Sequence, residues 1–197
     1  ESLEGCNEML CLTRPDVIES MHRAFLDVGV DVIETASFGS FSTVLVEYNI
    51  PEKAYELNVA AAAIARRVAD TYEVDGRPRY VAGSIGPGTK LPSLGHIDFA
   101  TLRDSYEEQA RGLRDGGSDL FLIETCMDLL QIKAAMQACR RAMKSVGREV
   151  PIQVQVTMET TGRMLVGTEI GAAYASLQAM KPDVIGINCA TGPSEMQ

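Results

Sequence analysis

The stretch "GSDLFLIETCMD", residues 117–128, repeats a phrase that occurs twice more in the chain. "GVDVIETASFG" at 29–39 and "KPDVIGINCATG" at 181–192 share its order: a Gly or Pro where a helix would end, an Asp, an apolar run, then polar residues. Such a phrase is typical of a helix followed by a buried strand that opens into a loop. Three copies predict repeated βα units, and right-handed crossovers between such units give a parallel sheet.

Further apolar and helical patterns extend this repeat along the chain. Strands are predicted at 31–36, 79–85, 119–125, 152–157 and 183–188, and helices at 13–28, 52–73, 98–115, 128–146 and 168–180. An open doubly wound sheet and a (β/α)₈ barrel both fit, but no GxGxxG motif follows an early strand. A barrel needs about 250 residues and eight strands. We therefore expect an α/β fold: a TIM barrel of about five βα units, with its first and last strands missing.

Composition places the chain among globular proteins. With 197 residues and 46% hydrophobic content, residues 1–197 form one domain or part of one. No apolar run is long enough to cross a membrane, and the first residues do not resemble a signal peptide, so a cytoplasmic location is expected. A net charge of −9 disfavours nucleic acid as a partner. Five cysteines without a CxxC pair argue against a disulfide framework.

Polar residues gather where the predicted strands end. In a parallel barrel the carboxyl ends of all strands meet at one face, which would bring together Glu34, Ser84, Glu124, Asn188 and Cys189. A single Glu in such a place is more often a solvated helix cap. Two Glu residues, each in an Ile-Glu-Thr motif, favour instead a binding site in which a carboxylate binds the ammonium group of an amino-acid ligand.

Two other features remain open from the residues alone. The loop "SIGPGTKLPSLGH" at 84–96 could cradle a phosphate, but its prolines remove amide donors and favour a rigid structural loop. Cys189, at a strand end before a turn, is as compatible with an inert thiol as with a metal ligand. Neither histidine has an obvious nucleophile, so Ser–His chemistry has no support.

The motifs, taken together, resemble the homocysteine S-methyltransferase family, and within it the homocysteine-binding module of cobalamin-dependent methionine synthases. The resemblance rests on "GVDVIETASFG", "GSIGPGTKLPSLGH", "LIETCMDLLQIKAA", "TMETTGRMLVGTEIG" and "IGINCATGP", in the family's order and spacing. It implies a (β/α)₈ barrel that activates homocysteine through zinc and transfers a methyl group from methylcobalamin to form methionine. The cobalamin and folate modules of the same long chain, which use methyltetrahydrofolate, are the implied partners.

The resemblance also assigns roles to residues. Glu124 matches the carboxylate that holds the homocysteine amino group, and Glu34, Ser84 and Asn188 are expected to complete the substrate site. Cys189 matches one of three zinc cysteines, and the chain ends before the family's other two. Relatives usually show "ETNTFG" where this chain has "ETASFG", so Ala36 replaces an amide.

Other classes of function remain as alternatives. A barrel lyase or isomerase with a phosphorylated substrate, or a non-catalytic module that kept the fold, would share these strands. With only one zinc cysteine, this chain alone is expected to be zinc-free and inactive in methyl transfer. Unpaired strand edges are also expected to make it self-associate.

Overall fold

The computed structural model describes residues 3–74, 76–147 and 149–196. Its parallel sheet consists of β1 (Val32–Glu34), β2 (Tyr80–Ile85), β3 (Leu120–Cys126), β4 (Ile152–Val156) and β5 (Val184–Ile187). Neighbours in the sheet are also neighbours in sequence, in the order β1-β2-β3-β4-β5. A doubly wound sheet reverses its strand order at a switch point, whereas barrel strands follow one another. The order therefore settles the choice in favour of barrel topology.

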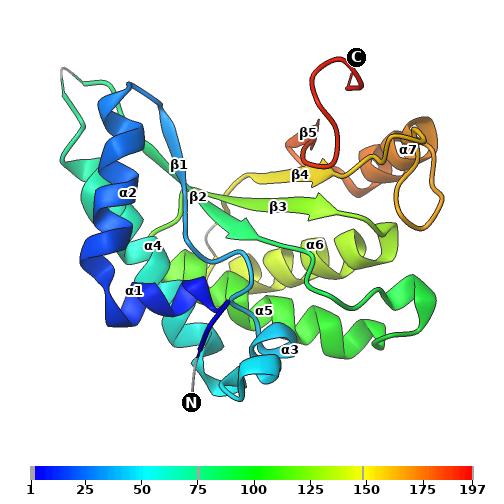
Figure 1. The fold of residues 1–197 in the computed structure, drawn as a ribbon, viewed down its shortest axis with the longest axis horizontal. Coiled ribbons are helices and arrows are strands. Elements are labelled where there is room, and N and C mark those ends of the chain that lie inside the picture. Colours follow the sequence, from blue (N-terminus) through cyan, green and yellow to red (C-terminus); the bar gives the residue numbers. More distant parts are fainter. Residues whose placement is uncertain (1–2, 75, 148, 197) are drawn as a thin grey trace.

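The helices lie against one face of the sheet and around its two ends. They are α1 (Leu10–Thr13), α2 (Pro15–Asp27), α3 (Ser42–Leu45), α4 (Ala54–Asp70), α5 (Phe99–Asp115), α6 (Leu129–Lys144) and α7 (Ile170–Met180), with short 3₁₀ turns at Asn7–Met9, Val46–Tyr48, Pro51–Lys53 and Pro92–Leu94. Figure 1 shows α4, α5 and α6 side by side beneath the sheet, α2 beside β1 and α7 near β4 and β5. No helix among the described residues is long and apolar enough to cross a membrane.

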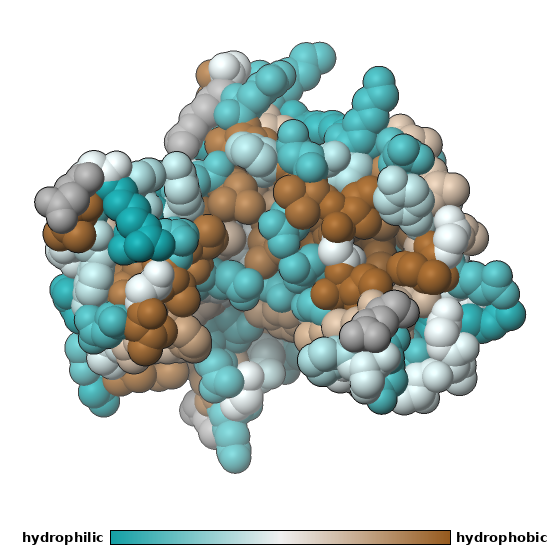
Figure 2. Space-filling view, turned by 90° about the horizontal axis from the view of Figure 1, so that it is seen from above, coloured by the Kyte–Doolittle hydropathy of each residue, from teal (hydrophilic) through white to brown (hydrophobic). Residues whose placement is uncertain are grey.

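Alternate residues of each strand face opposite sides of the sheet. In β4, Ile152, Val154 and Val156 join the core formed with α5 and α6, while Gln153 and Gln155 between them are only half-buried. The other face of the sheet carries no helix in Figure 1. Figure 2 views the molecule from above and shows hydrophobic patches interspersed with hydrophilic side chains. In a closed barrel this face becomes the interior.

The sheet remains open within the described residues, with β1 and β5 at its edges. Val32 and Val184, on these edge strands, are 45% and 47% exposed. The predicted edges are thus confirmed, and each exposes backbone groups that can pair with a further strand.

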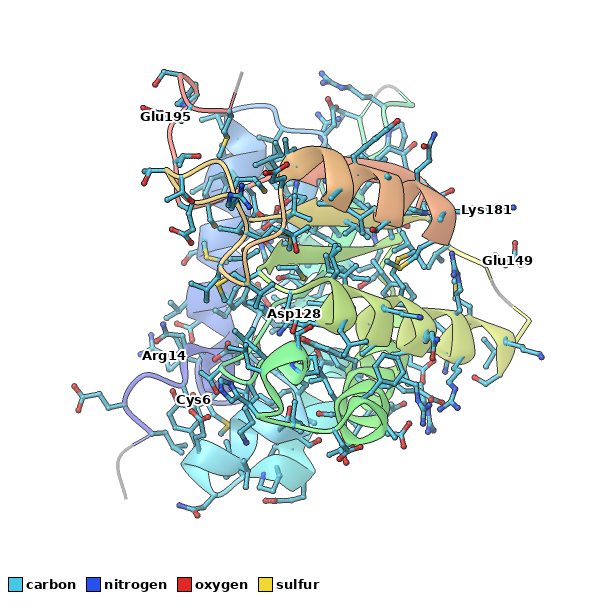
Figure 3. All side chains as sticks on the ribbon, turned by 90° about the vertical axis from the view of Figure 1, so that its right-hand side faces the viewer. Cys6, Arg14, Asp128, Glu149, Lys181 and Glu195 are labelled. Atoms are coloured by element: carbon cyan, nitrogen blue, oxygen red, sulfur yellow. The ribbon has the colours of Figure 1, made fainter. Side chains whose placement is uncertain are left out.

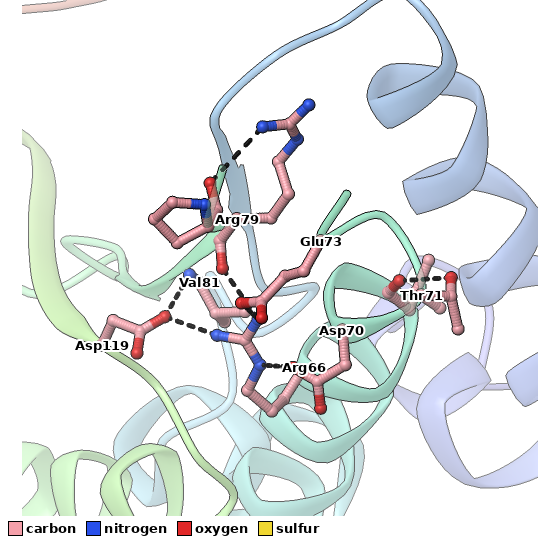
Figure 4. A network of polar contacts seen from close by, with 9 residues as sticks. Arg66, Asp70, Thr71, Glu73, Arg79, Val81 and Asp119 are labelled. Carbon is pink, nitrogen blue, oxygen red and sulfur yellow. Dashed lines mark hydrogen bonds and ion pairs between the residues drawn. The ribbon is translucent and has the colours of Figure 1, made fainter. Parts of the chain in front are cut away.

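A polar network fixes the amino ends of the central strands. The Arg66 guanidinium contacts Asp119 at 2.8 Å and Asp70 at 2.5 Å and donates to the Arg79 carbonyl oxygen (Figure 4). The Asp119 carboxylate also accepts the Val81 amide at 2.7 Å. Helix α4 is thereby joined to β2 and β3 at the end of the sheet opposite the candidate site.

All five strands and the five long helices were predicted, but the short helices α1 and α3 and the exact start of α7 were not. Cys11 is buried in α1. Helix α7 begins at Ile170 after Glu169. Thr168, within the predicted helix at 168–180, instead lies in the preceding turn, where its carbonyl oxygen accepts the Met164 amide.

Candidate functional site

The five residues predicted for the site all lie at the carboxyl ends of strands. Glu34 ends β1, Ser84 and Glu124 lie near the ends of β2 and β3, and Asn188 and Cys189 directly follow β5. Ser84 and Glu124 alternate with Ile85 and Ile123, which pack into the helix-facing core. Their side chains therefore belong to the face of the sheet that carries no helix.

Glu124 is the centre of this group. The Ser84 hydroxyl donates to its Oε1 at 2.6 Å, and the Asn188 amide donates to its Oε2 at 3.3 Å. The side chain is buried, at 8% exposure. Burial raises the pKa of Glu124, as does the nearby Glu34 carboxylate, while the Ser84 hydrogen bond opposes the shift. The raised pKa reflects the free-energy cost of burying the ionised carboxylate, and a cation bound at Glu124 would offset that cost.

A cavity of about 520 Å³ opens beside Glu124. It is lined by polar and apolar side chains from the amino-terminal segment, α2, β1 and its loop, β2 and β3: Asn7, Glu8, Leu10, Val17, Ile18, Met21, Glu34, Thr35, Ala36, Ser37, Phe38, Ser84 and Glu124. Glu34 is exposed, yet partial burial still raises its pKa. Two carboxylates beside apolar walls form a site suited to a small cation that has an apolar portion.

The two Ile-Glu-Thr motifs are not equivalent in the sheet. Glu34 pairs with Ala82, and Ala82 pairs with Leu120, so Glu34 is level in register with a residue four positions before Glu124. Both carboxylates nevertheless line the same cavity. The register separates their roles, because only Glu124 has hydrogen bonds to Ser84 and Asn188 among the contacts described here.

Asn188 and Thr125 connect Glu124 to Cys189. The Thr125 amide donates to Asn188 Oδ1 at 2.9 Å, and Asn188 Nδ2 donates to Thr125 Oγ1, also at 2.9 Å. Cys189 Sγ lies 3.5 Å from both Thr125 Oγ1 and Asn188 Nδ2. Thr125 and Cys189 have φ values of 58° and 60°, a left-handed conformation that costs energy for residues other than glycine.

Residues that sequence reasoning did not assign to the site hold Ser84 in place. The Ser84 amide donates to Thr35 Oγ1 at 2.9 Å, and its carbonyl oxygen accepts from Ser37 Oγ at 2.8 Å. Gln109 on α5 is fully buried and donates to the Ser37 carbonyl oxygen at 2.8 Å. The only sequence signal was a Gln at a core position of the helix.

The loop at 84–96 is held from beneath through its carbonyl groups. Tyr106 donates to the carbonyl oxygens of Gly86 and Pro87, and Gln131 also donates to that of Pro87. The Gly86 amide donates to the Phe38 carbonyl oxygen, and Asp128 accepts from the Ser93 amide and hydroxyl. These contacts favour the rigid structural loop over the phosphate cradle, because several of the loop's amides, including those of Gly86 and Ser93, already have protein partners.

The cysteines near the ends of β3 and β5 differ in exposure. Cys189, which follows β5, is exposed, whereas Cys126 at the end of β3 is buried in the core between the sheet and the helices. Burial raises the pKa of Cys126 strongly, which disfavours the thiolate that binds metal. No group of three or more His, Cys, Asp or Glu residues able to hold a metal ion occurs among the described residues.

A second cavity, of about 990 Å³, lies away from this site. It is bounded by the end of α6 and the amino end of β4, and its lining includes Arg140, Glu149 and Lys181. Figure 3 shows Glu149 and Lys181 at the right-hand side of the molecule and Glu195 at the left. It therefore contributes nothing to the group around Glu124.

Comparisons with known proteins agree with this geometry. The profile of the homocysteine S-methyltransferase family matches residues 1–197. The chain is 53% identical over 194 residues to methionine synthase of Mycobacterium leprae (strain TN), and equally so to that of Mycobacterium tuberculosis (strain ATCC 25618 / H37Rv). In both cases the match covers 98% of this chain and 16% of the relative, so the chain spans about a sixth of the relatives' length.

Solved structures show the same fold at low sequence identity. The metallated form of the homocysteine methyltransferase MmuM from Escherichia coli superposes with a TM-score of 0.79 at 21% identity, covering 95% of this chain and 67% of MmuM. Its apo form gives a TM-score of 0.73 at 22% identity, covering 98% of this chain and 68% of MmuM. The open five-stranded sheet is thus arranged as part of a barrel of this type.

Proposed function

The chain belongs to the homocysteine S-methyltransferase family, and from that premise we propose that residues 1–197 are part of the homocysteine-binding module of a methionine synthase. In this proposal the module binds homocysteine and presents its sulfur for methylation, which forms methionine. The names of the relatives and the family match over the whole chain support the assignment.

The observation that carries the proposal is the environment of Glu124. Its carboxylate is buried, oriented by Ser84 and Asn188, and open to a cavity with a second carboxylate, Glu34. An α-ammonium group is a suitable ligand, because a charge-assisted hydrogen bond strengthens where water is excluded. The apolar side chains of Met21 and Phe38 offer contact to the carbon atoms of an amino acid.

We assign the sulfur end of the substrate to Cys189. A free thiol is mostly protonated at neutral pH, and zinc bound through cysteine thiolates activates a substrate thiol by favouring its thiolate form. Cys189 is exposed at the same end of the sheet as Glu124 and fits the role of one zinc ligand. The described residues do not form a complete ligand set, so the remaining ligands would come from outside this chain.

The methyl donor in this proposal is methylcobalamin, which is recharged from methyltetrahydrofolate by other modules of the same polypeptide. The relatives are about six times as long as this chain, which leaves room for such modules. In this arrangement the exposed strand ends around Cys189 face the donor, while Glu124 holds the substrate.

The test is formation of methionine from homocysteine by the full-length polypeptide, together with analysis of its bound metal. We expect homocysteine-dependent methylation with methylcobalamin, and zinc that is lost when Cys189 is changed to Ser. A full-length protein that neither binds homocysteine nor holds a thiolate-bound metal would support a non-catalytic module or another barrel enzyme instead.

A further inference from the structure

We propose that Asn188 is a positioning residue that fixes the separation between Glu124 and Cys189, and thereby selects the length of the amino thiol that the site accepts. The inference rests on the proposed function, in which Glu124 binds the ammonium group and Cys189 belongs to the sulfur end.

The Asn188 side chain contacts both ends of the site through one atom. Its Nδ2 lies 3.3 Å from Glu124 Oε2 and 3.5 Å from Cys189 Sγ, so the carboxylate and the sulfur are within two hydrogen-bond lengths of each other. They belong to different strands and are 65 positions apart in sequence. No other described side chain is recorded in hydrogen bonds with both residues.

Thr125 fixes the orientation of the Asn188 amide. Its backbone amide donates to Asn188 Oδ1, and its hydroxyl accepts from Asn188 Nδ2, both at 2.9 Å. Because the two ends of the amide are bound to one residue, the side chain cannot rotate without losing both contacts. Thr125 and Cys189 also have the left-handed backbone noted above, and such conformations persist only where surrounding contacts over-determine them.

The Asn188 amide also links the hydrogen bonding of Glu124 to that of Cys189, in addition to fixing the distance between them. An amide nitrogen has two hydrogens, but Nδ2 has three acceptors within reach, and Thr125 Oγ1 is the nearest. Glu124 and Cys189 therefore share the second hydrogen. When a substrate ammonium binds Glu124, that hydrogen becomes available to the sulfur of Cys189.

A fixed spacing between the two anchors favours one length of substrate. Homocysteine has three carbon atoms between its nitrogen and its sulfur, and cysteine has two. If the anchors are held rigidly at the separation that suits homocysteine, cysteine cannot engage both. Discrimination by one methylene is otherwise modest, roughly 10- to 200-fold in a hydrophobic pocket, so rigid anchors matter.

The experiment uses the full-length polypeptide and calorimetric titration with homocysteine and with cysteine. Asn188→Ala should weaken homocysteine binding about tenfold, the scale expected for loss of a hydrogen bond to a charged group. Cysteine binding should change little, so the ratio of the two affinities falls. Hydrogen exchange at the Thr125 amide, which donates to Asn188, should become faster in this variant.

Two further variants separate positioning from general damage. Asn188→Asp keeps an acceptor for the Thr125 amide, so that amide should stay protected, but it has no donor for Glu124 or Cys189 and should lose discrimination like Asn188→Ala. Asn188→Asp also provides the test of the inference if Asn188→Ala does not fold. Thr157→Val removes a bond from the Thr157 hydroxyl to the Asn188 carbonyl oxygen and leaves the side chain alone. This control should retain the wild-type ratio.

The possible results are distinguishable. An affinity ratio unchanged in Asn188→Ala and Asn188→Asp, with the wild type binding homocysteine, would overturn this inference and leave the proposed function intact. A ratio that falls equally in Thr157→Val would show a general effect of the strand end and would also overturn it. A wild-type protein that does not bind homocysteine would overturn both.

Discussion

Replacing Glu124 with Gln tests whether the Glu124 carboxylate binds the ammonium group of the substrate. Gln keeps the size of the side chain and an oxygen that can accept the 2.6 Å bond from Ser84, but it removes the negative charge. A hydrogen bond to a charged group contributes about 1.5–3 kcal/mol. The buried setting of Glu124, at 8% exposure, favours the middle of this range rather than its lower end. A loss of about 2 kcal/mol corresponds to a rise of ~30-fold in the KM for homocysteine.

The assay is steady-state methyl transfer by the full-length enzyme with homocysteine varied and the methyl donor saturating. The KM should rise while kcat changes less, because the ammonium group is bound alike in the ground and transition states. Glu34→Gln is the matched control: Glu34 lines the same cavity but is exposed, so its effect should be several times smaller. Equal KM values for wild type and Glu124→Gln would refute the reasoning, and a larger effect of Glu34→Gln would transfer the role to Glu34.

Three further predictions concern pH, assembly and metal. The raised pKa of Glu124 means that the native state keeps this proton to higher pH than the unfolded chain, so stability falls as pH rises from 4.5 through the native pKa. Glu124→Gln should therefore raise the melting temperature at neutral pH, and this increase should vanish below pH 4.5. An increase that does not depend on pH would disprove the prediction. The free edges of β1 and β5 should make residues 1–197 self-associate, whereas light scattering from a compact monomer with protected edge amides would contradict this. The same chain should bind no stoichiometric zinc, and zinc that survives dialysis against a weak chelator but is lost in Cys189→Ser would prove this wrong.

The fold could be predicted where hydrophobic periodicity is strong. The Val- and Ile-rich runs located every strand to within two residues at either end, and the repeated phrase pointed to parallel βα units. Helix α1 could not be found this way, because "LCLT" is a single turn without a periodic pattern. The length and composition of the chain also left barrel and open sheet undecided, and it was the strand order, a tertiary property, that decided between them.

The grouping of these polar residues could be predicted, but the hydrogen bonds between them could not. Ser84, Glu124, Asn188 and Cys189 could be grouped because the ends of parallel strands converge. The hydrogen bonds within the group depend on backbone conformations that cannot be predicted from the local sequence, such as the left-handed conformation of Thr125. Glu34 and Glu124 also lie at different levels along the strands. This difference depends on the strand register, which cannot be read from the repeated motif.

The proposed binding of the substrate ammonium group by Glu124 is tested most directly by a crystal structure of the full-length polypeptide with homocysteine. We expect the homocysteine nitrogen within about 2.7–2.9 Å of a Glu124 carboxylate oxygen, with the sulfur directed toward Cys189. Homocysteine bound with its nitrogen on another group, or bound outside the cavity between Glu34 and Glu124, would contradict this role of Glu124.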